Sequence, residues 1–289
     1  MILIADSGST KTDWCLCNKG TVLQNIQTQG INPYHQTEEA IEQVLREELL
    51  PQFETQGSRI KAQSSGSSII FYGAGCANET ACNRVKTAIS KVLNAAAITI
   101  HSDLLGAARA LCGHEEGIAC VLGTGSNSCL YNGKEIIANI PPLGYILGDE
   151  GSSAVLGRRL VGDCLKNQLP EAVRDEFLAE YGLTQEVILE KVYRQPLANR
   201  FLASLTPFLS KHKEVPEVHK LLVESFVDFF VRNVKQYRRP WLPIHFVGSI
   251  ANAFSAELKE AAESLGMELG TIMQSPIKGL IKYHTEEQQ

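Results

Sequence analysis

One pattern of short strands and small-residue loops occurs twice in the sequence, near residues 2 and 118, and it limits the fold more than any other feature. The first copy has strand, loop, strand, turn and strand segments at residues 2–6, 7–11, 12–17, 18–20 and 21–26. The second copy, with a shorter hairpin, has them at residues 118–122, 123–126, 128–131, 132–133 and 135–138. Alternating apolar residues bounded by turn residues are typical of hairpin strands. A repeated unit of this kind predicts two related domains.

The segments between and after the repeats alternate between helical and strand-like patterns. Apolar residues recur at helical spacing at residues 38–50, 79–93, 104–112, 253–265 and 277–283, and helices dominate from about 150 to 239. Strand-like runs occur at residues 68–72, 97–101, 244–247 and 267–273. This alternation predicts an α/β protein with domains at residues 1–113 and 114–289. The second domain carries a helical insertion, and the last helix is a candidate to pack back onto the first domain.

Composition excludes several classes of protein. At 289 residues the chain is long enough for two domains, because one domain has about 150 residues. The 27 Lys and Arg against 32 Asp and Glu give a net charge of −5, which argues against nucleic acid or an anionic membrane as a partner. No apolar run approaches the ~18 residues of a membrane span, and the first residues lack the charged start of a secretion signal. We therefore expect a cytoplasmic protein that acts on a small molecule.

The eight cysteines form no recognisable redox or metal motif. No two of them have the C-x-x-C spacing, and most lie in apolar runs, where a reduced cysteine acts as a small hydrophobic residue. They stand at positions 15, 17, 76, 82, 112, 120, 129 and 164. We expect neither a disulfide framework nor a zinc or iron–sulfur site.

The first small-residue loop follows a strand and has the composition of a phosphate-binding turn. Glycine lets backbone N–H groups approach phosphate oxygens, and hydroxyl and lysine side chains add donors. The candidate phosphate-binding residues are Gly8, Ser9, Thr10 and Lys11. Asp6, at the end of the strand, is placed to hold Mg²⁺ through water beside the phosphates. An ordinary hairpin loop has the same composition, so this loop alone does not decide the function.

The corresponding loop of the second repeat predicts a second phosphate clamp, made of Gly123, Thr124, Gly125 and Ser126. The sequence has no G-x-x-x-x-G-K-[ST] stretch, which excludes a P-loop NTPase. The loop begins like a dinucleotide fingerprint, but Ser128 replaces the last glycine and a strand follows instead of a helix. A further small-residue loop, containing Gly248 and Ser249, suits the flat face of a nucleotide.

Three acids and one asparagine are candidate functional residues, and each also has a purely structural interpretation. Asp103 follows the strand at residues 97–101, where a carboxylate serves either as a general base or as a helix N-cap. Asp149 and Glu150 lie between glycines just before a long helix, as substrate ligands or as partners of the helix dipole. Asn32 is a candidate substrate contact or an ordinary turn residue.

Taken together, these motifs resemble the actin, sugar-kinase and Hsp70 ATPase superfamily. Within it they resemble the BadF/BadG/BcrA/BcrD ATPase family and its N-acetylglucosamine kinase branch. The resemblance covers nearly the whole chain and rests on five motifs in order, at residues 6–12, 102–103, 123–127, 148–152 and 247–249. The sequence departs from the family at Ser7, where many of these kinases have glycine, and at Lys11, where arginine is common.

The resemblance implies two ribonuclease H-like domains, as in the actin-like ATPases, that flank a nucleotide cleft for ATP and Mg²⁺. In the kinase branch, the aspartate that matches Asp103 takes the proton of the sugar hydroxyl, and the residues that match Asn32 and Asp149 bind the sugar. The implied reaction is the ATP-dependent phosphorylation of an amino sugar. N-acetylglucosamine is the expected substrate and its 6-hydroxyl the expected acceptor.

Two other functions stay open at this point. The same family contains ATP-hydrolysing activators of dehydratases or reductases, which hold an iron–sulfur cluster through cysteines from each subunit of a dimer. The cysteine spacing argues against that function. A non-enzymatic sugar or nucleotide sensor with this fold is the other alternative, and the presence of Asp6 and Asp103 argues against it. Apolar helices between residues 196 and 240 are a candidate homodimer face.

Overall fold

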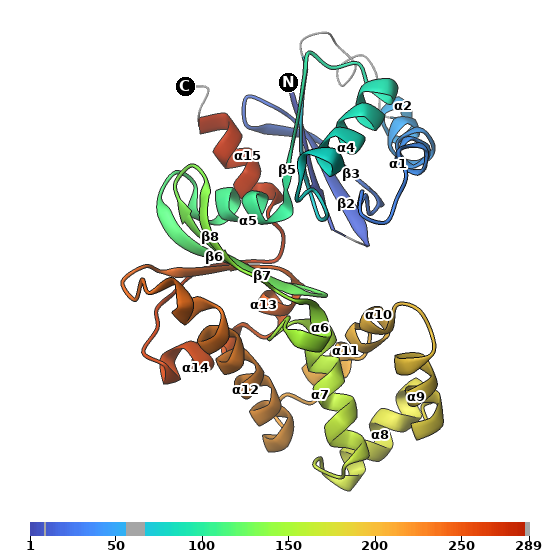
Figure 1. Cartoon of the computed structure of the whole chain (residues 1–289), viewed down its shortest axis with the longest axis vertical. Helices are drawn as coiled ribbons and strands as arrows, with labels where there is room; N and C mark the ends of the chain where they lie inside the picture. Colours follow the sequence, from blue (N-terminus) through green and yellow to red (C-terminus); the bar gives the residue numbers. More distant parts are fainter. Residues whose placement is uncertain (9, 56–66, 287–289) are drawn as a thin grey trace. The chain divides into compact units, whose positions relative to one another are not determined.

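Two five-stranded sheets with the same strand order organise the chain (Figure 1). The computed structural model describes residues 1–8, 10–55 and 67–286. It divides into two compact units. The first contains Met1–Glu115, Gly133–Glu135 and Pro276–Gln289, and the second contains Glu116–Asn132 and Ile136–Ser275.

The first sheet has the order β3-β2-β1-β4-β5. Its strands are β1 (Ile2–Ser7), β2 (Lys11–Asn18), β3 (Thr21–Gln29), β4 (Ser68–Gly73) and β5 (Ala97–Ser102). Strands β1, β2 and β3 form an antiparallel meander, whereas β1, β4 and β5 are parallel. Their register places Ser7, Gly73 and Ser102 in one row. The carboxyl ends of the three parallel strands therefore lie at one edge of the sheet.

The second sheet repeats this topology with the order β10-β9-β6-β7-β8. Its strands are β6 (Glu116–Leu122), β7 (Ser126–Asn132), β8 (Ile136–Ile140), β9 (Ile244–Val247) and β10 (Leu269–Met273). Again the first three are antiparallel, and β6, β9 and β10 are parallel. Each meander has a register shift between its second and third strands, where the third strand carries one extra residue, Leu23 in β3 and Ile137 in β8. The predicted α/β fold with a repeated strand unit is confirmed.

The helices of the first unit bury their apolar faces on its sheet. They are α1 (Glu38–Val44), the π-helix η1 (Leu45–Leu49), α2 (Leu50–Thr55), α4 (Glu79–Val92), α5 (Asp103–Cys112) and α15 (Ile277–Glu286). Thr37 caps α1 by accepting the Ala40 N–H, which stabilises the exposed helix start. Helix α15 packs on α5, where a Cβ on Gly279 would lie 2.3 Å from the Ala110 carbonyl oxygen. Only glycine allows this close approach of the two helices.

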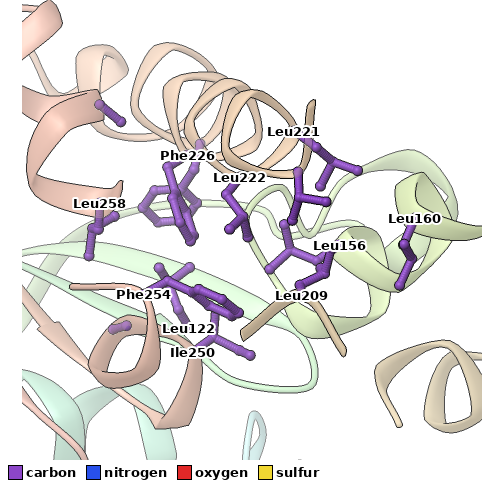
Figure 2. Packing of buried hydrophobic residues seen from close by; sticks show 14 of the residues in the cluster. Leu122, Leu156, Leu160, Leu209, Leu221, Leu222, Phe226, Ile250, Phe254 and Leu258 are labelled. Carbon is purple, nitrogen blue, oxygen red and sulfur yellow. The ribbon is translucent and has the colours of Figure 1, made fainter. Parts of the chain in front are cut away.

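The second unit contains the predicted helical region, between β8 and β9. The helices of this region are α6 (Gly144–Leu147), α7 (Ser153–Leu165), α8 (Glu171–Tyr181), α9 (Gln185–Tyr193), α10 (Ala198–Ala203), α11 (Thr206–Lys211), α12 (Pro216–Arg232) and the 3-10 helix η2 (Val234–Tyr237). Two more helices of this unit, α13 (Ser249–Ala253) and α14 (Ser255–Ser264), lie between β9 and β10. Figure 2 shows their shared core, in which Leu156 of α7 and Phe226 of α12 pack near Leu122 at the end of β6. Among the described residues, every helix is too short or too polar to span a bilayer.

Candidate active site

Asp6 and Asp103 both lie at the carboxyl edge of the first sheet. Asp6 is the residue before Ser7 on β1, and Asp103 follows Ser102 at the end of β5. Because β1, β4 and β5 run parallel, the residues at their ends gather at this edge, where sites of open α/β sheets form. Burial above all, and then the charge of Asp103, raises the pKa of Asp6, as expected for two neighbouring carboxylates.

Asp103 is the first residue of α5, but it is not the cap of that helix. The Ser102 hydroxyl accepts the Leu105 N–H at 3.3 Å and fills the N-cap role. The Oδ1 atom of Asp103 accepts the Leu104 N–H at 2.9 Å. Burial raises the pKa of the Asp103 carboxyl, and this backbone hydrogen bond partly opposes the rise. The N-cap interpretation left open by the sequence therefore applies to Ser102, and the carboxylate of Asp103 keeps acceptor capacity for a ligand.

Asp6 is half-buried and surrounded by negative charge. Burial, with the charges of Asp103 and Asp13, raises the pKa of Asp6 to about 7, while Lys11 opposes the rise. A divalent cation placed here would relieve this accumulation of charge. No group of three His, Cys, Asp or Glu side chains able to hold a metal occurs in the described part of the chain. Mg²⁺ usually takes one or two carboxylates, waters and substrate phosphates, so Asp6 fits such a site.

The loop between β1 and β2 is a tight turn whose ends are fixed by backbone hydrogen bonds. The Gly8 N–H donates to the Lys11 carbonyl at 3.0 Å, and the Gly30 N–H donates to the Thr10 carbonyl at 3.1 Å. Gly8, Thr10 and Lys11 are exposed, and the Lys11 ammonium lies 2.7 Å from the Asp13 carboxylate. Ser9, the fourth predicted phosphate ligand in this loop, lies outside the described residues.

Two buried hydroxyls that the sequence left without a role anchor this loop. The hydroxyls of Ser7 and Thr12 lie 2.6 Å apart, and both residues are fully buried. They accept the Ile31 N–H at 2.9 and 3.2 Å, respectively. This network fixes the backbone of the residue before Asn32 against the end of β1. A glycine at position 7 would lack the side chain that makes these contacts.

Asn32 lies against the loop that follows β4. Its Oδ1 accepts the Tyr34 N–H at 3.0 Å, as in an Asx turn. A Cβ on Gly75 would lie 2.1 Å from that Oδ1, and the φ of Gly75 is +79°. Sequence reasoning missed the loop after β4. The sequence feature that could have indicated this loop is the pair of glycines, Gly73 and Gly75, directly after a predicted strand.

The loop of the second unit is held by the start of helix α7. The Gly123 N–H donates to the Gly125 carbonyl at 2.9 Å. The carbonyls of Gly123 and Thr124 accept N–H groups from Ser153 and Ala154 at 2.9 and 3.2 Å. These hydrogen bonds fix the loop's conformation.

Asp149 lies directly against this second loop. Its carboxylate accepts the Ser126 N–H, and a Cβ on Gly125 would lie 3.0 Å from its Oδ2. The φ of Asp149 is +52°, a left-handed conformation that only a few residue types tolerate. Burial and the neighbouring charge of Glu150 raise the pKa of Asp149 to about 6, against the opposing effect of the Ser126 hydrogen bond. The structure thus brings the predicted sugar ligand and the second predicted phosphate clamp together.

Glu150 is directed elsewhere. One of its carboxylate oxygens lies 2.5 Å from Nε of Arg232, and the other accepts a hydrogen bond from Asn233 Nδ2 at 3.2 Å. Arg232 is the last residue of α12, and Asn233 is the C-cap of that helix. The two neighbouring acids predicted to bind substrate therefore have different surroundings. Asp149 lies against the second loop, whereas Glu150 is paired with Arg232 and Asn233.

Gly248 and Ser249 lie at the carboxyl end of β9, beside the end of β6. A Cβ on Gly248 would lie 2.2 Å from the Leu122 carbonyl oxygen, and its φ is +130°. Only glycine fits this position. Ser249 is exposed at the first position of α13. The second sheet therefore gathers Gly123 and Gly248 at the edge that corresponds to the Asp6 edge of the first sheet.

Comparison with known proteins gave matches among solved structures alone. A scan against protein-family models found no match, and a search of the curated proteins found none. A putative N-acetylglucosamine kinase from Porphyromonas gingivalis is 50% identical, with a TM-score of 0.94 and 100% of each chain covered. A second one, from Chromobacterium violaceum, is 21% identical, with a TM-score of 0.79 and 98% of each chain covered. A ROK family glucokinase from Streptomyces griseus, in complex with glucose and AMPPNP, is 12% identical, with a TM-score of 0.54 over 98% of this chain and 97% of its own.

The similarities to the Chromobacterium violaceum and Streptomyces griseus structures establish the fold. The similarity to the Porphyromonas gingivalis structure goes further, since half of the residues are identical over the whole of both chains. The resemblance indicated by the sequence motifs is thereby confirmed, and the chain belongs to the N-acetylglucosamine kinase branch of the actin-like sugar kinases.

Proposed function

We propose that the protein transfers the γ-phosphoryl group of ATP to N-acetylglucosamine, with the 6-hydroxyl as acceptor. The observation that carries the proposal is the pair of half-buried carboxylates, Asp6 and Asp103, at the carboxyl edge of the first sheet. The 50% identity to a putative N-acetylglucosamine kinase supports the choice of substrate.

Asp103 acts as the general base in this proposal. Burial raises its pKa from the ordinary range of a carboxyl, which makes it a better proton acceptor for a sugar hydroxyl. The Ser102 cap and the Leu104 N–H fix its direction, so little reorganisation is needed during transfer. Phosphoryl transfer depends mainly on such positioning and on charge neutralisation.

The nucleotide is held by backbone N–H groups and side chains of the two loops, including Gly8, Thr10, Lys11 and residues 123–126. Gly248 and Ser249 contact the adenosine part of the nucleotide. Asp6 holds Mg²⁺ through water, and the metal supplies neutralisation of charge on the phosphates. Lys11 is free to move toward a phosphate, because an exposed ion pair such as Lys11–Asp13 is worth only about 0–1 kcal/mol.

Asn32 and Asp149 bind and orient the sugar. The Oδ1 of Asn32 is engaged by Tyr34, and its Nδ2 makes no hydrogen bond within the described residues, which leaves it to donate to a sugar oxygen. Asp149 retains acceptor capacity beyond its hydrogen bond to Ser126. Glu150 does not contact the sugar. Its contacts with Arg232 and Asn233 hold the backbone beside Asp149 against the end of α12.

We also infer a cytoplasmic protein, where ATP is available and cysteines stay reduced. All eight cysteines are free thiols in the structure. The apolar helices between residues 196 and 240 remain the proposed homodimer face.

The test is a panel of hexoses and amino sugars with Mg-ATP, read out by ADP release and by mass spectrometry of the sugar product. We expect N-acetylglucosamine to give the highest kcat/KM and a product phosphorylated at the 6-hydroxyl. ADP release that is independent of every sugar, together with iron in the purified protein, would favour the dehydratase or reductase activator instead. Binding of the sugar without turnover would favour a sensor.

A further inference from the structure

A cavity of about 260 Å³ in the second unit carries a concentration of arginines that the proposed reaction does not use. It is lined by residues of α7 and α12, which pack against each other. Figure 1 shows where these two helices lie in the fold. We call this cavity the arginine pocket and define it by Glu150, Arg158, Arg159, Ser225, Asp228 and Arg232. Three guanidinium groups and two carboxylates give it a net charge of +1, in a chain whose net charge is −5.

Most of the guanidinium donors in this pocket make no hydrogen bond to another described residue. Arg158 donates to the carbonyls of Tyr145 and Ile146 at 2.7 and 3.3 Å. Arg159 pairs with Asp228, and Arg232 pairs with Glu150 through Nε. Each guanidinium has five N–H donors in a planar fork, so these contacts leave the majority available. The pocket can therefore offer several donors to the oxygens of an anion.

A second observation points to a ligand. Ser225 is fully buried, lines the pocket, and its Oγ has no hydrogen-bond partner in the described part of the chain. Buried hydroxyls in folded proteins nearly always have a partner. Its Oγ is itself inaccessible to solvent, so a ligand oxygen in the pocket would become that partner only after the neighbouring side chains shift.

We propose that the arginine pocket binds a phosphate monoester. A phosphate group presents several strong acceptor oxygens and nearly two negative charges, which suits three guanidinium forks lining one cavity better than a single carboxylate does. A dianion would also neutralise the pocket's excess positive charge. The site is built from α7, α12 and the segment before α7, all within the second unit.

The pocket is linked to the sugar ligand Asp149 through Glu150. A phosphate competes with Glu150 for Arg232, and a shift of Glu150 is transmitted to its chain neighbour Asp149. This consequence rests on the proposed function, and it makes a phosphorylated sugar of the product's class a natural regulator. The binding itself does not depend on the proposed function.

The binding test uses isothermal titration of the full chain with glycerol 3-phosphate and, separately, with inorganic phosphate and inorganic sulfate. A saturating non-hydrolysable ATP analogue and N-acetylglucosamine are present to block competing phosphate sites. Tighter binding of glycerol 3-phosphate than of either inorganic anion identifies a monoester as the ligand. Preference for inorganic phosphate or sulfate, or absence of binding to the wild-type protein, overturns the proposal.

Variants locate the site. Arg159→Gln is expected to raise the dissociation constant about tenfold, the effect of one lost charge-assisted hydrogen bond. Ser225→Ala, which leaves every charge in place, should raise it severalfold. Arg194→Gln is the matched control, because Arg194 is a highly exposed arginine on another helix end, paired with Glu190. Equal affinity in Arg159→Gln, Ser225→Ala and Arg194→Gln contradicts the proposed site, and circular dichroism verifies that each variant is folded.

The sugar panel and the titration can fail separately. If the protein phosphorylates a sugar but does not bind glycerol 3-phosphate, only the proposal for the arginine pocket is contradicted. If the protein phosphorylates no sugar but binds glycerol 3-phosphate, and Arg159→Gln weakens this binding, the proposed function is contradicted and the anion site is supported.

Discussion

The hydroxyl of Tyr72 on β4 lies 2.8 Å from Nε2 of His284 on the last helix, α15. Arg109 of α5 donates a hydrogen bond to the same hydroxyl at 2.9 Å, so the phenol proton is directed to a neutral histidine. This chain of contacts joins β4, α5 and α15. Because Asp103 is the first residue of α5, the contact also helps to fix the candidate base.

The Tyr72–His284 contact predicts loss of stability in acid. Burial and the nearby positive charge of Arg109 lower the pKa of His284 to about 4. An unfolded histidine has a pKa near 6.5, so the contribution of His284 is intact above about pH 6.5 and is lost progressively as pH falls toward 4. The expected slope is at most about 1.4 kcal/mol per pH unit for this residue.

Urea unfolding at several pH values between 4 and 8 checks this prediction. His284→Gln should be less stable than wild type at pH 8 and should show a shallower loss of stability between pH 6.5 and 4. His101, whose pKa burial also lowers to about 4, and His245, whose pKa burial lowers, add slope of the same sign. Asp6 and Asp149, whose pKa values are raised, add slope of the opposite sign, so the comparison of His284→Gln with wild type isolates His284. Parallel pH profiles for wild type and His284→Gln would contradict the assignment.

Asp103→Asn is expected to retain ATP binding and to lose at least ~100-fold in turnover, the usual scale for a general base. The amide keeps the shape and the hydrogen bond to Leu104 but cannot accept the hydroxyl proton. Titration with ATP and a coupled ADP assay separate the two effects. Turnover close to wild type would exclude Asp103 as the base.

Asp6→Asn is expected to stabilise the free protein and to impair the enzyme. The pKa of Asp6 is raised to about 7, so the folded state favours the protonated carboxyl, and stability falls as pH rises from about 4 through 7. Removing the charge should raise the melting temperature at pH 8 by about 2–4 °C, equivalent to ~1 kcal/mol.

The same variant should weaken Mg-ATP use. Loss of a residue that orients a metal's water ligands typically costs about 10–100-fold in metal affinity or activity. Thermal scans with and without Mg-ATP, and kcat/KM as a function of Mg²⁺ concentration, measure both effects. Wild-type magnesium dependence in Asp6→Asn would show that another group holds the metal.

Gly125→Ala tests the contact between the second loop and Asp149. The added Cβ would lie 3.0 Å from Oδ2 of Asp149 and would displace the carboxylate. We expect the KM for the sugar to rise about tenfold, the effect of one misplaced charged hydrogen bond. Gly162→Ala is the matched control, because a Cβ on Gly162 in α7 meets nothing within 4 Å. It should stabilise the helix by about 0.5–1 kcal/mol with unchanged KM.

Asp149→Asn and Glu150→Gln are expected to separate binding from stability. Asp149→Asn should raise the KM for the sugar without lowering the melting temperature, because the pKa of Asp149 is raised to about 6 and the folded state therefore disfavours its charge at pH 8. Glu150→Gln weakens the contact to Arg232, whose side chain is 60% exposed, so the loss of stability should be only about 1 kcal/mol. A larger sugar KM effect from Glu150→Gln than from Asp149→Asn would reverse the roles assigned to them.

Much of the fold followed from local sequence patterns. The strand–loop–strand repeat predicted both meanders, because hairpin turns and alternating apolar residues are encoded within a few neighbouring positions. The segment at residues 38–50 was expected as one helix, whereas the structure has α1 followed by the π-helix η1. Such a change of helical winding depends on how Leu45 and Leu49 pack in the core, which the spacing of apolar residues does not encode.

The sequence by itself determined which loops, acids and glycines could carry phosphate chemistry, because their residue types and their positions after strands are local properties. Only the tertiary structure decided how they are used. Parallel pairing of β1, β4 and β5 brought Asp6 and Asp103 to one edge, and close packing placed Gly75 against Asn32 and Gly125 against Asp149. It also engaged Glu150 with Arg232, 82 positions later in the sequence. Contacts between residues so far apart depend on the folded backbone, and no local pattern specifies them.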